Sequence, residues 1–118
     1  MINELEIPMY LEEALPEISR DLVSNKKSSA FDLMTALIGF TSKNIKEHNY
    51  KSVKRCFQIA DKLYSRGNSI VKNAVQNVFV YSFTNMFQNY PAEKKQLLAI
   101  LPITLYSLYI SQIYHNGC

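Results

Sequence analysis

Residues 53–87, VKRCFQIADKLYSRGNSIVKNAVQNVFVYSFTNMF, decide the fold of this 118-residue chain. In the first half of this stretch, apolar residues recur at the spacing of one helix face, and basic residues occupy the opposite face. The apolar set is Val53, Cys56, Phe57, Ala60, Leu63 and Tyr64, and the basic set is Lys51, Lys54, Arg55, Lys62 and Arg66. The spacing predicts an amphipathic helix from about Tyr50 to Arg66.

The second half of the stretch predicts a helix that is apolar on nearly every side and therefore central in the fold. It begins at Asn68 or Ser69 and ends near Gln88, with Val71, Ala74, Val75, Val78, Phe79, Phe83 and Met86 as its apolar residues. Gly67 separates the two helices. We expect it to adopt the left-handed backbone conformation that often ends a helix.

Further helices are predicted on both sides of this pair. A short helix opens at Ile7-Pro8, and a second one starts at Pro16, because proline is tolerated in a first helical turn and disrupts an interior one. Ser28 or Ser29 caps a helix that ends at His48-Asn49 and buries Phe31, Met34, Leu37, Ile38, Thr41 and Ile45. Gly39 lies within this helix, where we expect a bend or a close helix crossing.

The C-terminal part of the chain predicts two more helices. The first spans about Pro91 to Leu101. The second begins at Pro102 and leaves Leu108 exposed, and its buried residues are expected to be Ile103, Tyr106, Tyr109, Ile110 and Ile113.

The composition favours an all-α protein. Only three glycines and four prolines occur, which is too few for the turns of a many-stranded sheet, and 47% hydrophobic residues are enough for a core. We expect one domain over residues 1–118, an antiparallel helical bundle or short helical-hairpin stack of five to seven helices. The start lacks the features of a signal peptide, and the most apolar segment, residues 97–110, is too short to span a membrane. Two cysteines are too few for a disulfide framework, which favours a reducing, cytoplasmic location.

Charge is distributed unevenly along the chain. Residues 1–21 contain six acidic residues and one basic residue, a net charge of −5. Because the whole chain has a net charge of +3, residues 22–118 carry +8. Either the acidic segment lies near the basic helix and neutralises it, or each surface awaits a partner.

No catalytic or metal motif is evident. Cys56 falls on the apolar helix face, where burial makes a thiol unreactive, so its pairing with His48 is not expected to form a nucleophilic site. His115 and Cys118 supply two of the four ligands that a structural zinc site needs. Glu12, Glu13 and Glu17 lie on a short exposed helix, which suits solvated carboxylates better than an acid–base pair. We therefore expect no cofactor, no metal and no enzymatic activity.

A polar face on the central helix is the first candidate binding surface. Asn73, Asn77, Val80 and Thr84 share it, and Tyr81 borders it. Amides beside exposed apolar groups suit a protein interface, although two asparagines could equally be buried against a neighbouring loop.

The basic helix, residues 51–66, is the second candidate. Lys54, Arg55, Lys62 and Arg66 could contact a partner, phosphates among the possibilities, or could be an ordinary solvated face. No aromatic residue alternates with the basic ones, which makes a nucleic-acid site the weaker interpretation.

Two segments resemble an uncharacterised family of small all-helical bacterial proteins. The first is residues 53–83, with a VKNA-x-x-NVFVYS core helix, and the second is ILPITLYSLYISQIYHNG at residues 100–117. In size and style this family is similar to the small cytoplasmic immunity proteins that neutralise interbacterial toxins.

Together these features favour a non-enzymatic protein-binding module, with immunity against a cognate bacterial toxin as its expected role. The alternative is a small nucleic-acid-associated or regulatory protein that uses the basic helix. An enzyme would require titratable groups that folding brings together from distant positions. The partner and the oligomeric state do not follow from the sequence.

Overall fold

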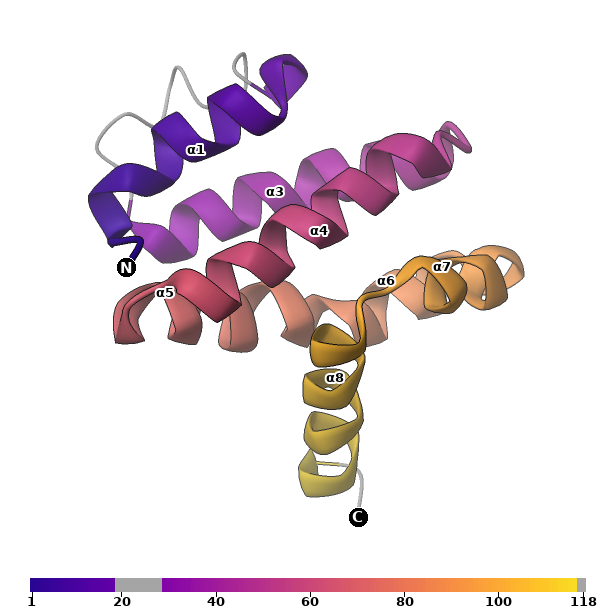
Figure 1. Ribbon diagram of the computed structural model, residues 1–118. Helices are drawn as coiled ribbons and strands as arrows, with labels where there is room; N and C mark the ends of the chain where they lie inside the picture. The colour runs from indigo at the N-terminus through magenta and orange to yellow at the C-terminus, as the bar shows by residue number, and fades with distance from the viewer. Residues whose placement is uncertain (19–28, 117–118) are drawn as a thin grey trace.

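The computed structural model describes residues 1–18 and 29–116, without the side chains of the last two, and its regular structure there is helical (Figure 1). The all-α prediction is confirmed. The longer helices are α1 (Ile7–Ala14), α3 (Ala30–Lys46), α4 (Tyr50–Arg66), α5 (Ser69–Ala74), α6 (Phe83–Asn89), α7 (Lys94–Ile100) and α8 (Ile103–Asn116). Short 3-10 turns precede α1 (η1, Glu4–Glu6), follow it (η2, Pro16–Ile18) and precede α7 (η5, Pro91–Glu93). Of the helix expected to start at Pro16, residues 16–18 form η2, and the rest of that prediction lies outside the described residues.

Helices α3 and α4 form an antiparallel hairpin. The Ser29 hydroxyl caps α3 by accepting from the backbone N–H of Asp32, and the Asp32 carboxylate accepts from the N–H of Ser29 in return. Of the two predicted caps, Ser29 is therefore the correct one. The tight turn into α4 places His48 in the left-handed region, at φ 59°.

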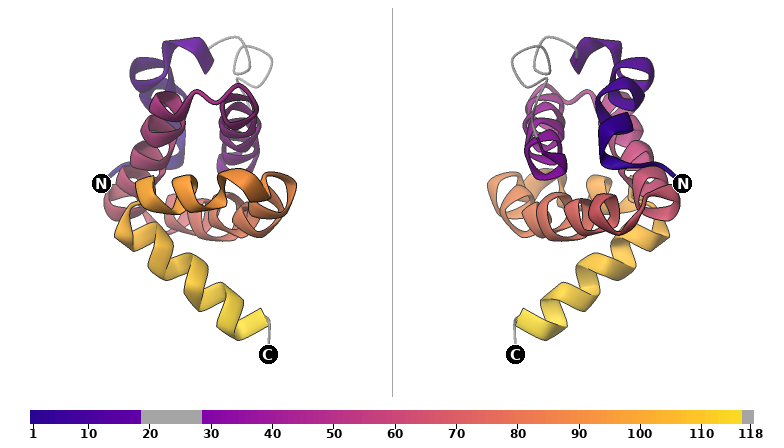
Figure 2. Two further views of the ribbon diagram at one scale, coloured as in Figure 1. Left: turned by 90° about the vertical axis from the view of Figure 1, so that its right-hand side faces the viewer. Right: turned by 90° about the vertical axis from the view of Figure 1, so that its left-hand side faces the viewer.

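The central segment of residues 69–89 is helical throughout but irregular in its middle. It consists of α5, a π-turn (η3, Val75–Phe79), a 3-10 turn (η4, Val80–Ser82) and α6. It crosses α3 and α4 on the side opposite α1, so the hairpin lies between them (Figures 1 and 2). The central position predicted for this helix is confirmed.

Gly67 does not have the expected left-handed conformation. Its φ of −77° and ψ of 157° are extended, and it forms an isolated parallel bridge with Ile2. The N–H of Ile2 donates to the carbonyl of Arg66, and the N–H of Asn68 donates to the carbonyl of Ile2. Glycine is required here by space, because a Cβ would collide with the Leu63 carbonyl and approach Val71 Cγ1 at 2.5 Å.

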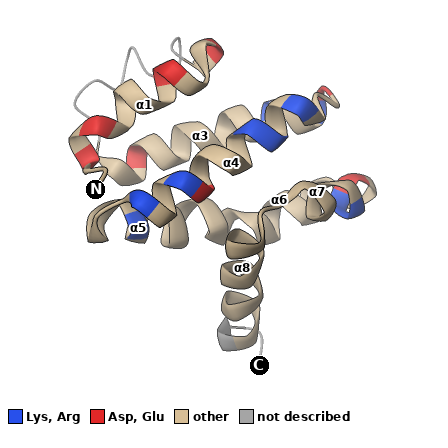
Figure 3. Cartoon of the chain, in the orientation of Figure 1, with Lys and Arg blue, Asp and Glu red and all other residues tan. Residues whose placement is uncertain are grey.

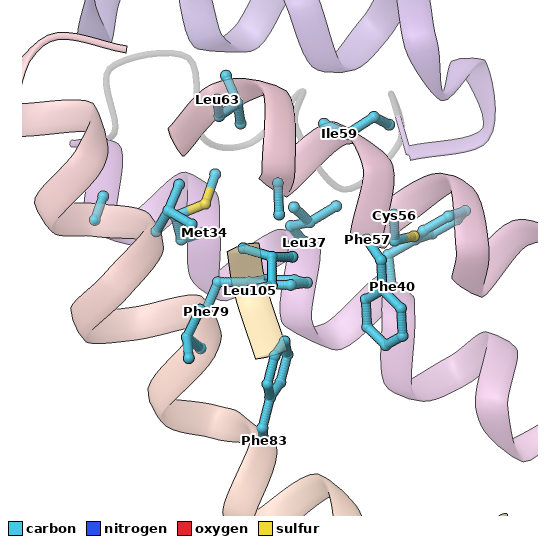
Figure 4. Close-up of a cluster of buried hydrophobic side chains, with 14 of the residues drawn as sticks. Met34, Leu37, Phe40, Cys56, Phe57, Ile59, Leu63, Phe79, Phe83 and Leu105 are labelled. Atoms are coloured by element: carbon cyan, nitrogen blue, oxygen red, sulfur yellow. The ribbon is translucent and has the colours of Figure 1, made fainter. Parts of the chain in front are cut away.

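The core contains a cluster of aromatic rings from α4, the central segment and α8, of which Figure 4 shows Phe57, Phe79 and Phe83. Phe57 of α4 meets Phe79 and Phe83 edge-on, with ring centroids 6.3 and 5.7 Å apart. Tyr109 of α8 packs edge-on against Phe83 and Phe87. These contacts tie the hairpin, the central segment and α8 into one core.

In two helices the buried residues differ in part from the predicted ones. In α3, Phe31 is exposed, and the buried side includes Ala30, Leu33 and Phe40 together with the predicted Met34, Leu37, Thr41 and Ile45. Gly39 is exposed, and no atom lies within 4 Å of the position that a Cβ would take there. It therefore does not lie at a close helix crossing.

In α8 the difference is larger. Leu101, just before the helix, Leu105 and Tyr109 are buried, whereas Ile103, Tyr106 and Ile113 are exposed. Ile110 and Leu108 are half-buried. The C-terminal end of the helix projects from the body (Figures 1 and 2). Only its inner side therefore meets the core.

Candidate protein-binding surface

An uncharged stripe runs along the exposed side of the central segment. Six exposed side chains form this amide stripe: Ile70, Asn73, Asn77, Tyr81, Thr84 and Gln88. Tyr81 is the aromatic residue among them, and 63% of its surface is exposed. Asn73 and Asn77 are exposed as well, so the alternative in which both amides are buried against a loop is wrong.

Val80 is not part of this surface. It is fully buried, which contradicts its predicted place on the exposed face. The reason is the π-turn, in which the N–H of Val80 donates to the carbonyl of Val75, five residues earlier instead of four. The extra residue advances the register, so Tyr81 takes the surface position that Val80 would have in a regular helix.

The π-turn is braced by α8. The side-chain amide of Gln112 donates to the backbone carbonyl of Gln76 at 2.7 Å. Helix α8 also packs on η4, which contains Tyr81. Thus α8 borders the amide stripe and fixes the irregular turn at its centre. Sequence reasoning missed Gln112, although it belongs to the QI pair of the last motif.

The basic residues of α4, blue in Figure 3, differ in their exposure and contacts. Lys54, Lys62 and Arg66 are exposed, as are Lys51 and the neutral Gln58. Arg55 is half-buried and donates from Nη2 to the backbone carbonyl of Ala14 in α1. Arg55 therefore holds α1 against α4, and its predicted availability to a partner is reduced.

The structure does not merge the two predicted surfaces into one. The central segment packs against the buried side of α4, so the exposed sides of the two helices turn away from each other. At the α4–α5 junction, the Lys72 ammonium lies 5.7 Å from the centre of the Tyr64 ring. We treat the amide stripe and the basic face as separate surfaces.

A cleft of about 460 Å³ lies between α1 and α4. Its lining carries both signs of charge and consists of Tyr10, Ala14, Arg55, Gln58, Ile59, Asp61 and Lys62. The acidic segment thus lies beside the basic helix, as one of the two readings expects. Among the described residues, however, no ion pair joins an acid of α1 to a base of α4. The Glu4 carboxylate instead accepts from the Asn68 amide at 2.9 Å, which lowers the pKa of Glu4.

The described candidate reactive groups, Cys56 and His48, lie in different surroundings. Cys56 is buried, and the loss of solvent raises the pKa of its thiol to about 11. His48 is exposed and faces Glu93, with 3.7 Å between Nδ1 and Oε1, at the corner between α7 and the hairpin. Within residues 1–18 and 29–114, no three His, Cys, Asp or Glu side chains cluster as metal ligands do. The side chain of His115 and all of Cys118 lie outside the described residues.

None of the described helices is both long enough and apolar enough to cross a membrane.

Comparison with known proteins identifies a family but no characterised relative. No curated protein and no solved structure matches the chain. The family described as "Domain of unknown function (DUF7674)" matches residues 8–115. This match covers the described helices from α1 to α8, apart from the first residue of α1 and the last of α8, and includes the amide stripe and the basic face. The chain therefore belongs to the DUF7674 family.

Proposed function

We propose that this protein is a non-enzymatic binding module that holds another protein through the amide stripe. The observation that supports this is the stripe itself, a row of exposed side chains without charge, with Tyr81 63% exposed at its centre. A rigid aromatic ring surrounded by amides is typical of the residues that anchor protein partners. Neutral amides also cost less to desolvate in an interface than ions do.

The partner that we propose is a bacterial toxin, for which the protein acts as a cytoplasmic immunity factor. A protein that neutralises a toxin by binding it needs a preformed surface but no reactive group. The buried, unreactive thiol of Cys56 is consistent with such a role. The exposed Lys51, Lys54 and Lys62 of α4 would attract an acidic partner and speed its approach.

Co-expression with a candidate toxin tests this role. The candidate is the product of the gene next to the one that encodes this chain. We expect the pair to copurify, and co-expression to restore growth that the toxin alone stops. An equal-sized helical protein serves as the control for a non-specific effect.

Salt dependence separates this proposal from the nucleic-acid alternative. A complex centred on neutral side chains should survive about 0.5 M salt, where charge interactions are screened within a few ångströms. Binding to phosphates would weaken steeply over the same range. Failure to copurify, together with salt-sensitive binding to RNA or DNA, would refute the toxin-binding role and favour the basic helix.

A further inference from the structure

The cleft between α1 and α4 contains a guanidinium group whose charge is not balanced. Arg55 is half-buried in the cleft wall, and its Nη2 donates to the backbone carbonyl of Ala14, which is a neutral group. Within the described part of the chain, no carboxylate forms an ion pair with Arg55, and its other N–H groups make no further hydrogen bond. A partly desolvated cation is stabilised by an anion beside it, so this wall favours a negatively charged ligand.

Groups from both helices surround the guanidinium. Arg55, Ile59 and Lys62 follow one another at intervals of four and three residues, so they form one line along α4. Ile59 is only 6% exposed and gives the cleft an apolar surface. Helix α1 contributes Tyr10 and Ala14, which are four residues apart. The cleft therefore combines two cations, a phenol and an apolar surface.

The phenol of Tyr10 is a hydrogen-bond donor in this setting. Loss of solvent raises the pKa of Tyr10, although the positive charge of Arg66 acts to lower it. The hydroxyl therefore keeps its proton at neutral pH and can donate to an anion. The ring of Tyr10 adds a flat apolar surface on which the uncharged part of a ligand can lie.

We propose that the cleft binds a small carboxylic acid in its ionised form, with the carboxylate between Arg55 and Lys62 and an uncharged body against Ile59 and Tyr10. Arg55 and Lys62 contribute two positive charges and Asp61 contributes one negative charge, so the lining has a formal charge of +1. This balance suits the single charge of a carboxylate better than the two charges of a phosphate ester. The planar fork of a guanidinium also matches the two oxygens of a carboxylate.

The cleft has the size of a small-molecule site and lies apart from the amide stripe. Its volume of about 460 Å³ falls within the range of roughly 300–1,000 Å³ that is usual for such sites. The central segment crosses the α3–α4 hairpin on the side opposite α1 (Figures 1 and 2). A ligand in the cleft therefore leaves the proposed toxin-binding surface uncovered, and its binding does not depend on that role.

An NMR titration of the full chain with benzoate, at constant pH and ionic strength, tests the proposal. We expect a Kd of about 1–5 mM, which is usual for a ligand of this size. The amide signals that shift should be those of Tyr10, Ala14, Arg55 and Ile59, which line the cleft. Benzamide is the matched control ligand, because it has the same ring without the charge, and it should bind at least roughly fivefold more weakly.

Three variants test the roles of the two cations. Lys62→Gln removes a charge at an exposed position and should weaken benzoate binding roughly three- to tenfold. Lys54→Gln is the matched control, since Lys54 is an exposed lysine of the same helix that does not line the cleft, and the Kd should change less than about twofold. Arg55→Lys keeps the charge and a donor for the Ala14 carbonyl but loses the planar fork, so binding should weaken roughly tenfold. Circular dichroism shows whether each variant is folded.

Phenyl phosphate distinguishes a carboxylate site from a phosphate site. It carries a similar ring and a second negative charge, which Asp61 would repel. We expect phenyl phosphate to bind no more tightly than benzoate in the same titration. Tighter binding of phenyl phosphate would overturn the assignment of a carboxylate ligand.

Two results would overturn the site itself. One is that benzoate shifts none of the cleft signals at about 20 mM, or binds no more tightly than benzamide. The other is an equal loss of benzoate affinity in Lys62→Gln and Lys54→Gln, because a general attraction to the basic helix would then explain the binding. Neither result bears on copurification with a toxin, so failure of this site and failure of the proposed function are distinguishable.

Discussion

At the scale of single residues, the two described glycines have opposite roles. A Cβ at Gly67 would collide with the Leu63 carbonyl and with the side chain of Val71, whereas nothing lies within 4 Å of a Cβ at Gly39. We expect Gly67→Ala to lower the free energy of unfolding by about 1–3 kcal/mol. Gly39→Ala, in mid-helix, should raise it by about 0.5–1 kcal/mol. Urea unfolding of both variants tests this, and an equal effect at the two positions would contradict the steric account.

The buried thiol of Cys56 should make stability fall in alkaline solution. Its pKa is about 11 in the folded protein, against an ordinary value of 9.0. The raised value means that the unfolded chain loses this proton first, so the stabilisation is complete below about pH 9 and is lost as the pH rises through about 11. We expect Cys56→Ala to show a smaller loss of stability across this range, measured by urea unfolding at each pH. Identical slopes for wild type and variant would contradict the burial of the thiol.

Reagent access gives an independent check on the same residue. In a Cys118→Ser background, Cys56 should stay unmodified by a thiol reagent until the protein is unfolded. Fast native labelling would return Cys56 to the candidate nucleophiles.

At the scale of elements, the sequence predicts the buried side of a helix best where the helix has a single apolar face. Helix α4 has a single apolar side, and its predicted bounds and the burial of Cys56 are confirmed. Helix α8 has apolar residues on two sides, so periodicity could not tell which side the core takes. The π-turn also limits what sequence periodicity can predict, because no local sequence pattern indicates it. Its extra residue places Tyr81 at the surface and buries Val80.

The brace between α8 and the π-turn predicts a further loss of stability. The Gln112 amide donates to the Gln76 carbonyl over 2.7 Å. Gln112→Ala should lower the free energy of unfolding by about 1 kcal/mol and speed hydrogen exchange around residues 75–82. Gln96→Ala is the matched control, since Gln96 is exposed on α7. If exchange around the π-turn is unchanged in Gln112→Ala, α8 does not hold the turn.

At the scale of the whole molecule, the charged helices lie beside each other without pairing. Helix α1 carries exposed acids and α4 exposed bases (Figure 3), and the charged residues that line the cleft between the two helices, Arg55, Asp61 and Lys62, all belong to α4. The charge asymmetry was evident in the sequence. The separation of the basic face from the amide stripe was not, because it depends on how α4 and the central segment pack.

The basic face should set the rate of partner binding more than its strength. We expect Lys54→Glu and Lys62→Glu to slow association with an acidic partner at low salt, while the dissociation rate changes little. Lys43→Glu, exposed on α3, is the matched control. Stopped-flow or surface-binding kinetics measures both rates, and a faster dissociation in the α4 variants would place these lysines inside the interface.

The most direct test of the central claim is a calorimetric titration of the partner with Tyr81→Ala. Tyr81 is exposed at the centre of the amide stripe, so its loss should leave the fold intact and weaken binding by roughly 30-fold or more. Phe31→Ala is the control, because Phe31 is an exposed aromatic residue of α3 outside the stripe, and it should bind as the wild type does. If Tyr81→Ala keeps the wild-type affinity, or if Phe31→Ala loses as much, the amide stripe is not the binding surface.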